Sequence, residues 1–161
     1  MPVDLAFVND LLASVQGVAD PFVLAAILCI STALVGGFGV PGLLVPLSFS
    51  SGLLLDSVIG APVVLLGLVL GSQGLFLAAR RGATSRRFAG SRFAGYAAAL
   101  ERRSGRYGPL YAAGLRVVGT PHVVVTFGSA VAGLRQRDFA LATLIGSAPA
   151  VALAAAAGAA I

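Results

Sequence analysis

Long stretches of this chain contain no Asp, Glu, Lys or Arg, and this feature limits its fold more than any other. The stretches are residues 21–55, 57–79, 117–134 and 139–161. A helix needs about 20 apolar residues to span a bilayer, and both 57–79 and 139–161 supply them. The sequence therefore predicts at least two membrane-spanning helices.

The composition also favours a membrane protein. Hydrophobic residues make up 58% of the chain and charged residues 11%, whereas soluble domains carry about 25% charged residues. So few charges cannot cover the outside of a 161-residue domain in water. We therefore expect an all-α integral membrane protein with lipid around much of its surface.

The first charge-free stretch is too long for one spanning helix, and glycine and proline interrupt it in GGFGVPGLLVP, residues 36–46. We divide it into a spanning helix over 21–35, begun by Asp20 and Pro21, and a broken re-entrant segment over 38–55. Ahead of both, residues 1–19 show apolar residues at helical spacing, which predicts an interfacial amphipathic helix.

Arginine predicts the orientation in the membrane. Eight of the 11 basic residues lie in the segment 80–106, a basic amphipathic segment that the positive-inside rule assigns to the cytoplasm. By the same rule Arg135 and Arg137 are inside, so 107–134 must enter and leave on one face as a re-entrant segment. In the first half, 21–35 then leads out of the cytoplasm and 57–79 leads back.

Two similar halves result, 20–79 and 107–161. Each contains a broken apolar segment followed by a charge-free run, and breaks at corresponding positions of oppositely inserted halves point to a substrate site at mid-membrane. The expected fold is a single membrane domain over 1–161, with spanning helices plus two oppositely inserted re-entrant helical hairpins in an inverted repeat.

Three motifs carry a family resemblance. GLRQRDFALATLIGSAP, residues 133–149, and VPGLLVPLSFSSGLLL, residues 40–55, together with Arg116 before a Pro-broken apolar segment, resemble the DedA/VTT-domain (SNARE-associated Golgi protein) family. They are similar to its C-terminal signature and to its first and second re-entrant elements. The resemblance covers about residues 20–161 and best fits a divergent, TVP-type branch.

The resemblance implies a fold with two re-entrant hairpins and a role in moving or scrambling lipids. In bacterial members the lipid is a polyprenyl phosphate carrier such as undecaprenyl phosphate. Arg116 matches the first of two family arginines spaced six apart, and His122 stands at the second position. The acids of the family's first hairpin are missing here, since Gly36 or Gly37 and Leu43 stand in their places.

Arg116 is the strongest candidate for substrate binding, because a charge in a membrane segment usually faces a cavity and its planar fork can hold a phosphate. An arginine reaching back to the headgroups is the alternative. His122 could donate to an anion or carry a proton, or simply bond the backbone freed by Pro121. Pro121, Pro41 and Gly42, as helix breaks, complete the predicted substrate site.

Two acids and a glycine pair have alternative interpretations. Asp56 could pair with Arg116 or carry a proton, but its place before an apolar run favours a helix N-cap, and Asp138 is interpreted in the same way. Gly67 and Gly71 form a small-xxx-small pair, which we expect to pack helices within the subunit.

The basic segment is expected to contact anionic lipid at the membrane surface, through Arg80, Arg81, Arg86, Arg87 and Arg92. Because the basic segment is attached to membrane helices, we expect it to bind anionic lipid and not nucleic acid. No cofactor and no metal are expected, since Cys29 and His122 are single and the acids are scattered. Neither a phosphate-binding Gly-Lys-Ser/Thr motif nor a Gly-x-Ser-x-Gly elbow is present, so an enzyme is not expected.

The sequence thus favours a lipid translocase or scramblase of a bacterial inner membrane. Its partners would be anionic phospholipid or polyprenyl phosphate, whose headgroup passes a cavity between the two hairpins. A proton-coupled transporter of a small solute or ion and a non-transporting membrane-organising protein stay open as alternatives, as does a homo-oligomer.

Overall fold

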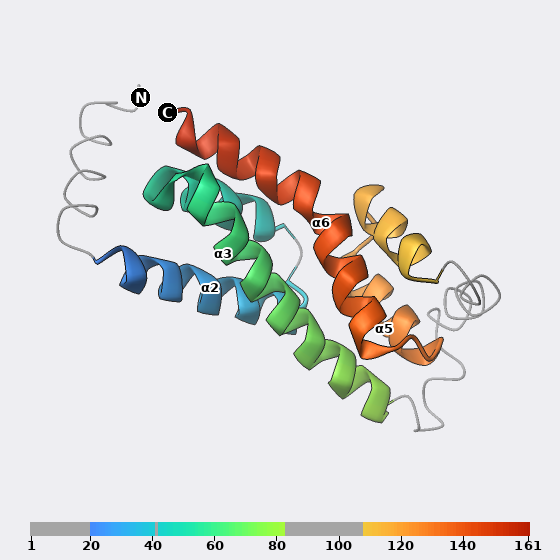
Figure 1. Cartoon of the computed structure of the whole chain (residues 1–161). Helices are drawn as coiled ribbons and strands as arrows, with labels where there is room; N and C mark the ends of the chain where they lie inside the picture. Colours follow the sequence, from blue (N-terminus) through green and yellow to red (C-terminus); the bar gives the residue numbers. More distant parts are fainter. Residues whose placement is uncertain (1–19, 41, 83–107) are drawn as a thin grey trace, which may run out of the picture.

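The computed structural model describes residues 20–40, 42–82 and 108–161, and the regular structure in these ranges is entirely helical. The helices are α2 (Pro21–Phe38), α3 (Leu44–Gly82), a helix over 108–117, α5 (His122–Val131) and α6 (Gln136–Ala159) (Figure 1). The all-α prediction is confirmed. The predicted interfacial helix over 1–19 and most of the basic segment 80–106 lie outside the described residues.

Helix α2 begins as predicted but ends later. Pro21 occupies its first turn, and the Asp20 carboxylate accepts from the backbone N–H of Phe22 at 2.9 Å. The end predicted at residue 35 is wrong, since Gly36 and Gly37 stay helical and the helix stops at Gly39, whose φ of 66° is left-handed. The two glycines remain in the helix because α2 packs tightly on α3 there.

Helix α3 consists of two helices that meet at a reversal. Asp56 has φ 65° and ψ 157°, which is not helical. The helix over 44–55 and the helix over 57–82 then pack against each other, since Gly60 lies against the carbonyl of Ser51. Pro46, predicted as a break, is tolerated because it stands in the first turn, where its missing N–H has no partner to lose.

Helix α2 runs parallel to the helix over 57–82. Gly67 lies against Cys29 and Gly71 against Ala33, so the residue numbers rise together along both helices. The topology expected from the arginines gives these helices opposite directions, and that prediction is wrong. Glycine and proline predict a break after α2. They do not predict that the helix over 44–55 runs in the opposite direction to α2, or that Asp56 then reverses the chain a second time.

Glycines lie at close contacts between the described helices. Gly67 and Gly71 join α3 to α2, so the prediction that they pack helices within the subunit is confirmed. A second seam joins the helix over 44–55 to α6, where Gly52 lies against Ala155 and Gly158 against Phe49. Close backbone approach at these seams leaves no room for a Cβ atom.

The second half also contains a break between two helices. The helix over 108–117 ends before Gly119, whose φ is 85°, and α5 starts after Pro121, so the break predicted at 119–121 is present. Helix α6 begins with Arg135 at its N-cap. The N-cap predicted for Asp138 is therefore wrong, because α6 starts earlier and Asp138 stands in its first turn.

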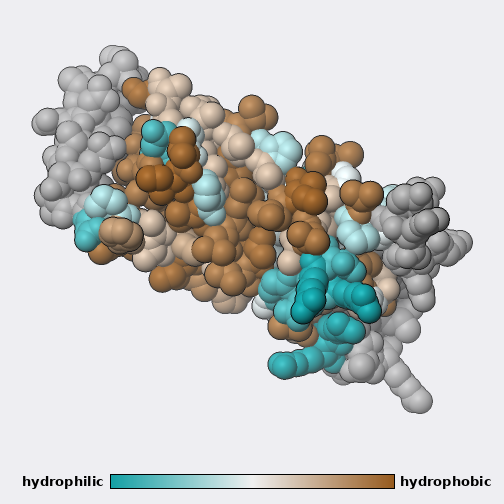
Figure 2. All heavy atoms as spheres, in the orientation of Figure 1, coloured by the Kyte–Doolittle hydropathy of each residue, from teal (hydrophilic) through white to brown (hydrophobic). Residues whose placement is uncertain are grey.

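Within the described residues, three stretches contain enough apolar helix to cross a membrane, namely Pro21–Phe38, Leu44–Arg81, which includes the reversal at Asp56, and Gln136–Ala159. Figure 2 shows hydrophobic residues over most of the described surface and hydrophilic ones gathered where α3 ends and α6 begins. These features are those of an integral membrane protein. Helix α5, with 10 residues, is only about 15 Å long, half the thickness of a hydrocarbon core. Re-entrant insertion of the broken segments stays a prediction.

Candidate functional site

The break between the helix over 108–117 and α5 brings Arg116 and His122 together. Arg116 lies in the last turn before the break and His122 in the first turn after it. Nη1 of Arg116 lies 2.6 Å from Nδ1 of His122. The two residues that the sequence singled out are thus direct hydrogen-bond partners.

The hydrogen bonds fix the state of the histidine. A guanidinium can only donate, so Nδ1 of His122 must accept from Arg116 and Nε2 must carry the proton. Nε2 lies 3.1 Å from Oγ of Ser72, which in turn donates to the carbonyl of Leu68. His122 is therefore neutral and joins Arg116 to α3.

Arg116 retains an unused hydrogen-bonding edge. Its Nε and Nη2 atoms are buried and have no hydrogen-bond partner among the described residues. These two nitrogens lie on the same side of the guanidinium and form the fork that binds two oxygens of a phosphate or carboxylate. None of the described acids, Asp20, Asp56 and Asp138, forms an ion pair with Arg116. A buried charge without a counterion is costly, so the site is suited to receive an anion.

Two stacked rings support Arg116 from α3 and α6. The guanidinium carbon lies 5.3 Å from the centre of the Phe139 ring, within cation–π range. Phe139 itself stacks on Phe76, with ring centres 4.5 Å apart and planes 17° apart. On α6, Gly146 leaves space for the arginine, since a Cβ there would lie 2.9 Å from Cβ of Arg116.

The two broken segments meet next to this site. Gly39, at the end of α2, lies against the side chain of Val123 in the first turn of α5. The backbone of Gly36 also faces the His122 ring. The ends of both breaks therefore contact each other, whereas the cavity predicted between them stays a prediction.

The other predicted substrate-site residues make no described hydrogen bond to the side chain of Arg116. Pro121 is the N-cap residue of α5 and Gly42 is exposed with φ 87°, while Pro41 lies outside the described residues. Asp56 is exposed at the reversal of α3, where its carboxylate accepts from the backbone N–H and the hydroxyl of Ser57. The structure thus places Asp56 at the N-cap position of the helix that follows it.

The arginines predicted to contact surface lipid are described only in part. Arg80 and Arg81 are exposed in the last turn of α3, and Arg86, Arg87 and Arg92 lie outside the described residues. In the described ranges, no three His, Cys, Asp or Glu side chains come together in a way that could hold a metal ion.

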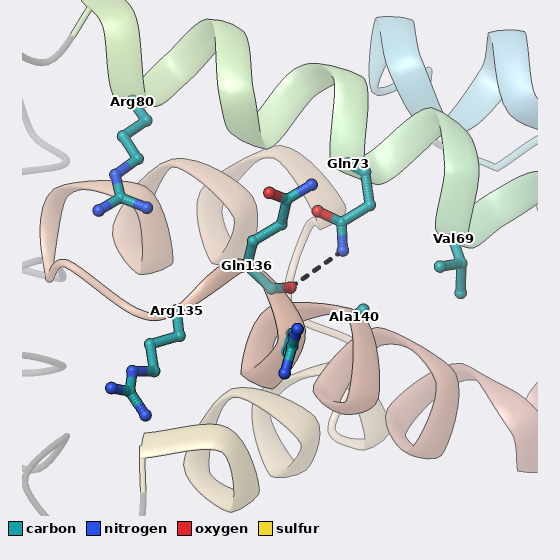
Figure 3. Close-up of a pocket in the computed structure, with 7 residues that line it drawn as sticks. Val69, Gln73, Arg80, Arg135, Gln136 and Ala140 are labelled. Carbon is teal, nitrogen blue, oxygen red and sulfur yellow. Dashed lines mark hydrogen bonds between the residues drawn. The ribbon is translucent and has the colours of Figure 1, made fainter.

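A basic pocket of about 770 Å³ lies where α3 ends and α6 begins. It is lined by Val69, Gln73, Arg80, Arg135, Gln136, Arg137 and Ala140 (Figure 3). Gln73 donates to the carbonyl of Gln136 at 3.1 Å, and the side-chain oxygen of Gln73 is buried with no hydrogen-bond partner among the described residues. Sequence reasoning missed Ser72 and Gln73, although they are the only polar pair in an otherwise apolar 58–79.

A comparison with protein families matches residues 40–160 to a family model described as VTT domain. The matched range includes both Arg116 and His122 and the whole of α3, α5 and α6. Comparisons with curated proteins and with solved structures found no match.

Proposed function

This chain belongs to the VTT-domain family, and on that premise we propose that it is a lipid translocase in which Arg116 binds the phosphate of the lipid headgroup. The family is associated with membrane proteins of the DedA type, of transporter or lipid-flippase kind. The substrate would be a phospholipid or a polyprenyl phosphate, and the membrane a bacterial inner membrane with the arginine-rich segment on its cytoplasmic side.

One observation carries the proposal: the Nε and Nη2 fork of Arg116 is buried and has no hydrogen-bond partner in the part of the chain that the structure describes. His122 holds Nη1, and Phe139 lies against the guanidinium at 5.3 Å, so the arginine is oriented before any ligand arrives. A phosphate could accept two charge-assisted hydrogen bonds from this fork. The lipid tails would remain in the bilayer, and the protein would lower the barrier for the headgroup alone.

The contact between the two breaks supports a headgroup path past Arg116. Irregular backbone at membrane depth is tolerated where protein buries it or water reaches it. Gly39 and the break at 119–121 supply such backbone near the arginine. The N-terminus of α5 adds unpaired N–H groups and the positive end of a helix dipole.

The test is transport in proteoliposomes that carry either a fluorescent phospholipid or a labelled polyprenyl phosphate. Arg116→Gln is expected to lower the initial transport rate at least tenfold, because two hydrogen bonds to a charged group contribute about 1.5–3 kcal/mol each. Arg116→Lys keeps the charge without the fork and should be intermediate. Arg81→Gln, which removes an exposed arginine, is the control and should transport normally.

Two outcomes would contradict the proposal. Transport that survives Arg116→Gln would exclude the phosphate-binding role of this arginine. If the wild-type protein moves neither lipid but changes the internal pH when a solute is added, a proton-coupled transporter would be favoured instead.

A further inference from the structure

We infer that a phosphate-bearing lipid binds between α3 and α6 from the side, with its phosphate in the basic pocket at Arg80, Arg135 and Arg137 and one hydrocarbon chain in the groove beside it. This is a second lipid site, separate from Arg116. Its occupancy does not depend on transport, so it goes beyond the proposed function.

Three arginines line the basic pocket. Arg80 extends from α3 toward the start of α6, where Arg135 and Gln136 lie (Figure 3). In the part of the chain that the structure describes, Arg80, Arg135 and Arg137 form no ion pair, not even with Asp138. Their charges are therefore free to act on a ligand in a pocket of about 770 Å³.

The start of α6 adds further donors at the same place. Its N-cap residue is Arg135, which makes no side-chain cap hydrogen bond, so the first backbone N–H groups of α6 remain available. These groups carry the positive end of the helix dipole. Arginine side chains and a helix N-terminus are both groups that bind phosphate.

An apolar groove of about 410 Å³ continues from the basic pocket along the same two helices. It shares Val69 and Ala140 with the pocket and is otherwise lined by Pro62, Leu65, Leu66, Leu141 and Leu144. A charged pocket that opens into a groove lined only by these apolar residues matches a molecule with a phosphate at one end and a hydrocarbon chain behind it. A free phosphate would leave the groove empty, so the combination points to a lipid.

The site is distinct from Arg116 because it uses another face of α6. Gln136, Ala140 and Leu144 line the pocket or the groove at helical spacing. Phe139 and Gly146, which contact Arg116, are buried on the side of α6 that faces the interior. Loss of Arg116 should therefore leave this second site intact.

The absence of tryptophan from the chain allows a direct test. Leu66→Trp places a fluorophore in the groove, at a side chain that is 56% exposed. Leu153→Trp, at an exposed position near the other end of α6, is the control. The full chain is reconstituted in phosphatidylcholine vesicles that contain a low fraction of dibrominated phosphatidic acid or, for comparison, of dibrominated phosphatidylcholine.

In the Leu66→Trp variant, dibrominated phosphatidic acid should quench the fluorescence several-fold more than dibrominated phosphatidylcholine, and the Leu153→Trp variant should show no such preference. When added to Leu66→Trp, Arg80→Gln, Arg135→Gln and Arg137→Gln should each lower the apparent affinity for phosphatidic acid about fivefold, since an arginine near an anionic lipid contributes about 1 kcal/mol. Arg81→Gln, which removes the same charge outside the pocket, and Arg116→Gln should have little effect on quenching.

Three results would overturn the inference. Equal quenching of the Leu66→Trp variant by both lipids would mean that the groove does not select a phosphate. An equal loss with Arg81→Gln would show that general surface charge, not the pocket, attracts the lipid. Displacement of phosphatidic acid by millimolar sodium phosphate would assign the pocket to a soluble anion. Because transport is not measured, none of these results depends on the proposed function.

Discussion

A neutral histidine, rather than an acid, holds Arg116. An acid at the same distance would neutralise the guanidinium and occupy it, whereas the imidazole takes one N–H and leaves the charge uncompensated. Ser72 then fixes the imidazole from the other side. The hydrogen-bonded series Arg116, His122 and Ser72 therefore orients the guanidinium without neutralising its charge. A site that binds an anion transiently requires such an arginine.

Replacing His122 separates orientation from charge. His122→Leu removes the acceptor for Nη1 of Arg116 and the partner of Ser72, so we expect the free energy of unfolding to fall by about 1–3 kcal/mol. Lipid transport should fall at least tenfold because the guanidinium is no longer held in place. His122→Gln, whose amide oxygen can accept from Arg116, should recover part of both. Thermal unfolding and transport of the two variants check this, and normal transport by His122→Leu would contradict it.

Sequence could predict the charged members of the site but not their support. Arg116 and His122 stood out because ionisable residues are rare in membrane segments. Ser72 and Phe139 belong to other helices, and in the sequence they look like any small polar or core residue. Their roles depend on how α3 and α6 pack next to the break, and this packing cannot be predicted from a local sequence pattern.

At the level of helices, glycine allows α2 and α3 to pack closely against each other. Helix α2 stays helical through Gly36 and Gly37 because they lie against α3, where a Cβ at Gly36 would be 3.2 Å from a methyl group of Leu68. Intrinsic propensity alone predicts that the helix ends earlier, at residue 35. Tertiary contact thus overrides the local preference over these two residues.

The α2–α3 seam can be tested with two glycines of the same helix. Gly71→Ala places a Cβ against the carbonyl of Ala33, and we expect it to lower the free energy of unfolding by about 1–3 kcal/mol. Gly74→Ala meets no atom within 4 Å and should instead raise it by up to about 1 kcal/mol, because alanine favours helix. Denaturant titration in detergent measures both. Equal effects of the two substitutions would mean that the seam is not closely packed.

Asp56 provides a second test at this scale. Its φ and ψ of 65° and 157° belong to a region that only glycine adopts without strain, at a cost of about 1–3 kcal/mol. Asp56→Gly should therefore raise the free energy of unfolding by about 1 kcal/mol, since loss of a cap to glycine costs only a few tenths.

Asp56→Ala is the matched comparison, because it loses the cap and keeps the strain. We expect it to lower the free energy of unfolding by about 1 kcal/mol. Both variants should transport lipid normally. A loss of transport in both would favour the role of Asp56 as a proton site or ion-pair partner over its role at the reversal.

Over the whole molecule, the described residues of each half form three helical segments in succession, whereas an inverted repeat stays a prediction. In the first, α2 runs parallel to the helix over 57–82, with the helix over 44–55 returning between them in sequence. In the second half, α5 starts after the break beside Arg116, and α6 starts at the end of the molecule that carries Arg135. Proline and glycine predicted the breaks within 36–46 and at 119–121, whereas the reversal at Asp56 contains neither residue. They did not predict the direction of α2, because it depends on contacts between segments that are distant in sequence.

The parallel course of α2 makes a topology prediction that differs from the one that arginine alone suggests. The start of α2 lies at the same end of the molecule as the Asp56 reversal, opposite the end where α3 stops and α6 starts (Figure 1). If the arginine end is cytoplasmic, α2 and the helix over 44–55 enter and leave from the outer face. Single cysteines at Phe22 and Val58, which are 85% and 78% exposed, should then react with an impermeant maleimide from outside intact cells.

Cysteines in place of Arg81 and Arg135 should react only after the cells are opened, and a Cys29→Ala background removes the native thiol. The pair at Phe22 and Val58 is decisive because a spanning α2 of the opposite direction would put these two positions on different faces. Labelling of Phe22→Cys from the arginine side would therefore contradict the parallel arrangement. If Phe22→Cys and Val58→Cys are both labelled from outside, the two broken segments enter the membrane from opposite faces. They then meet only at their tips, at Gly39 and Val123, beside Arg116.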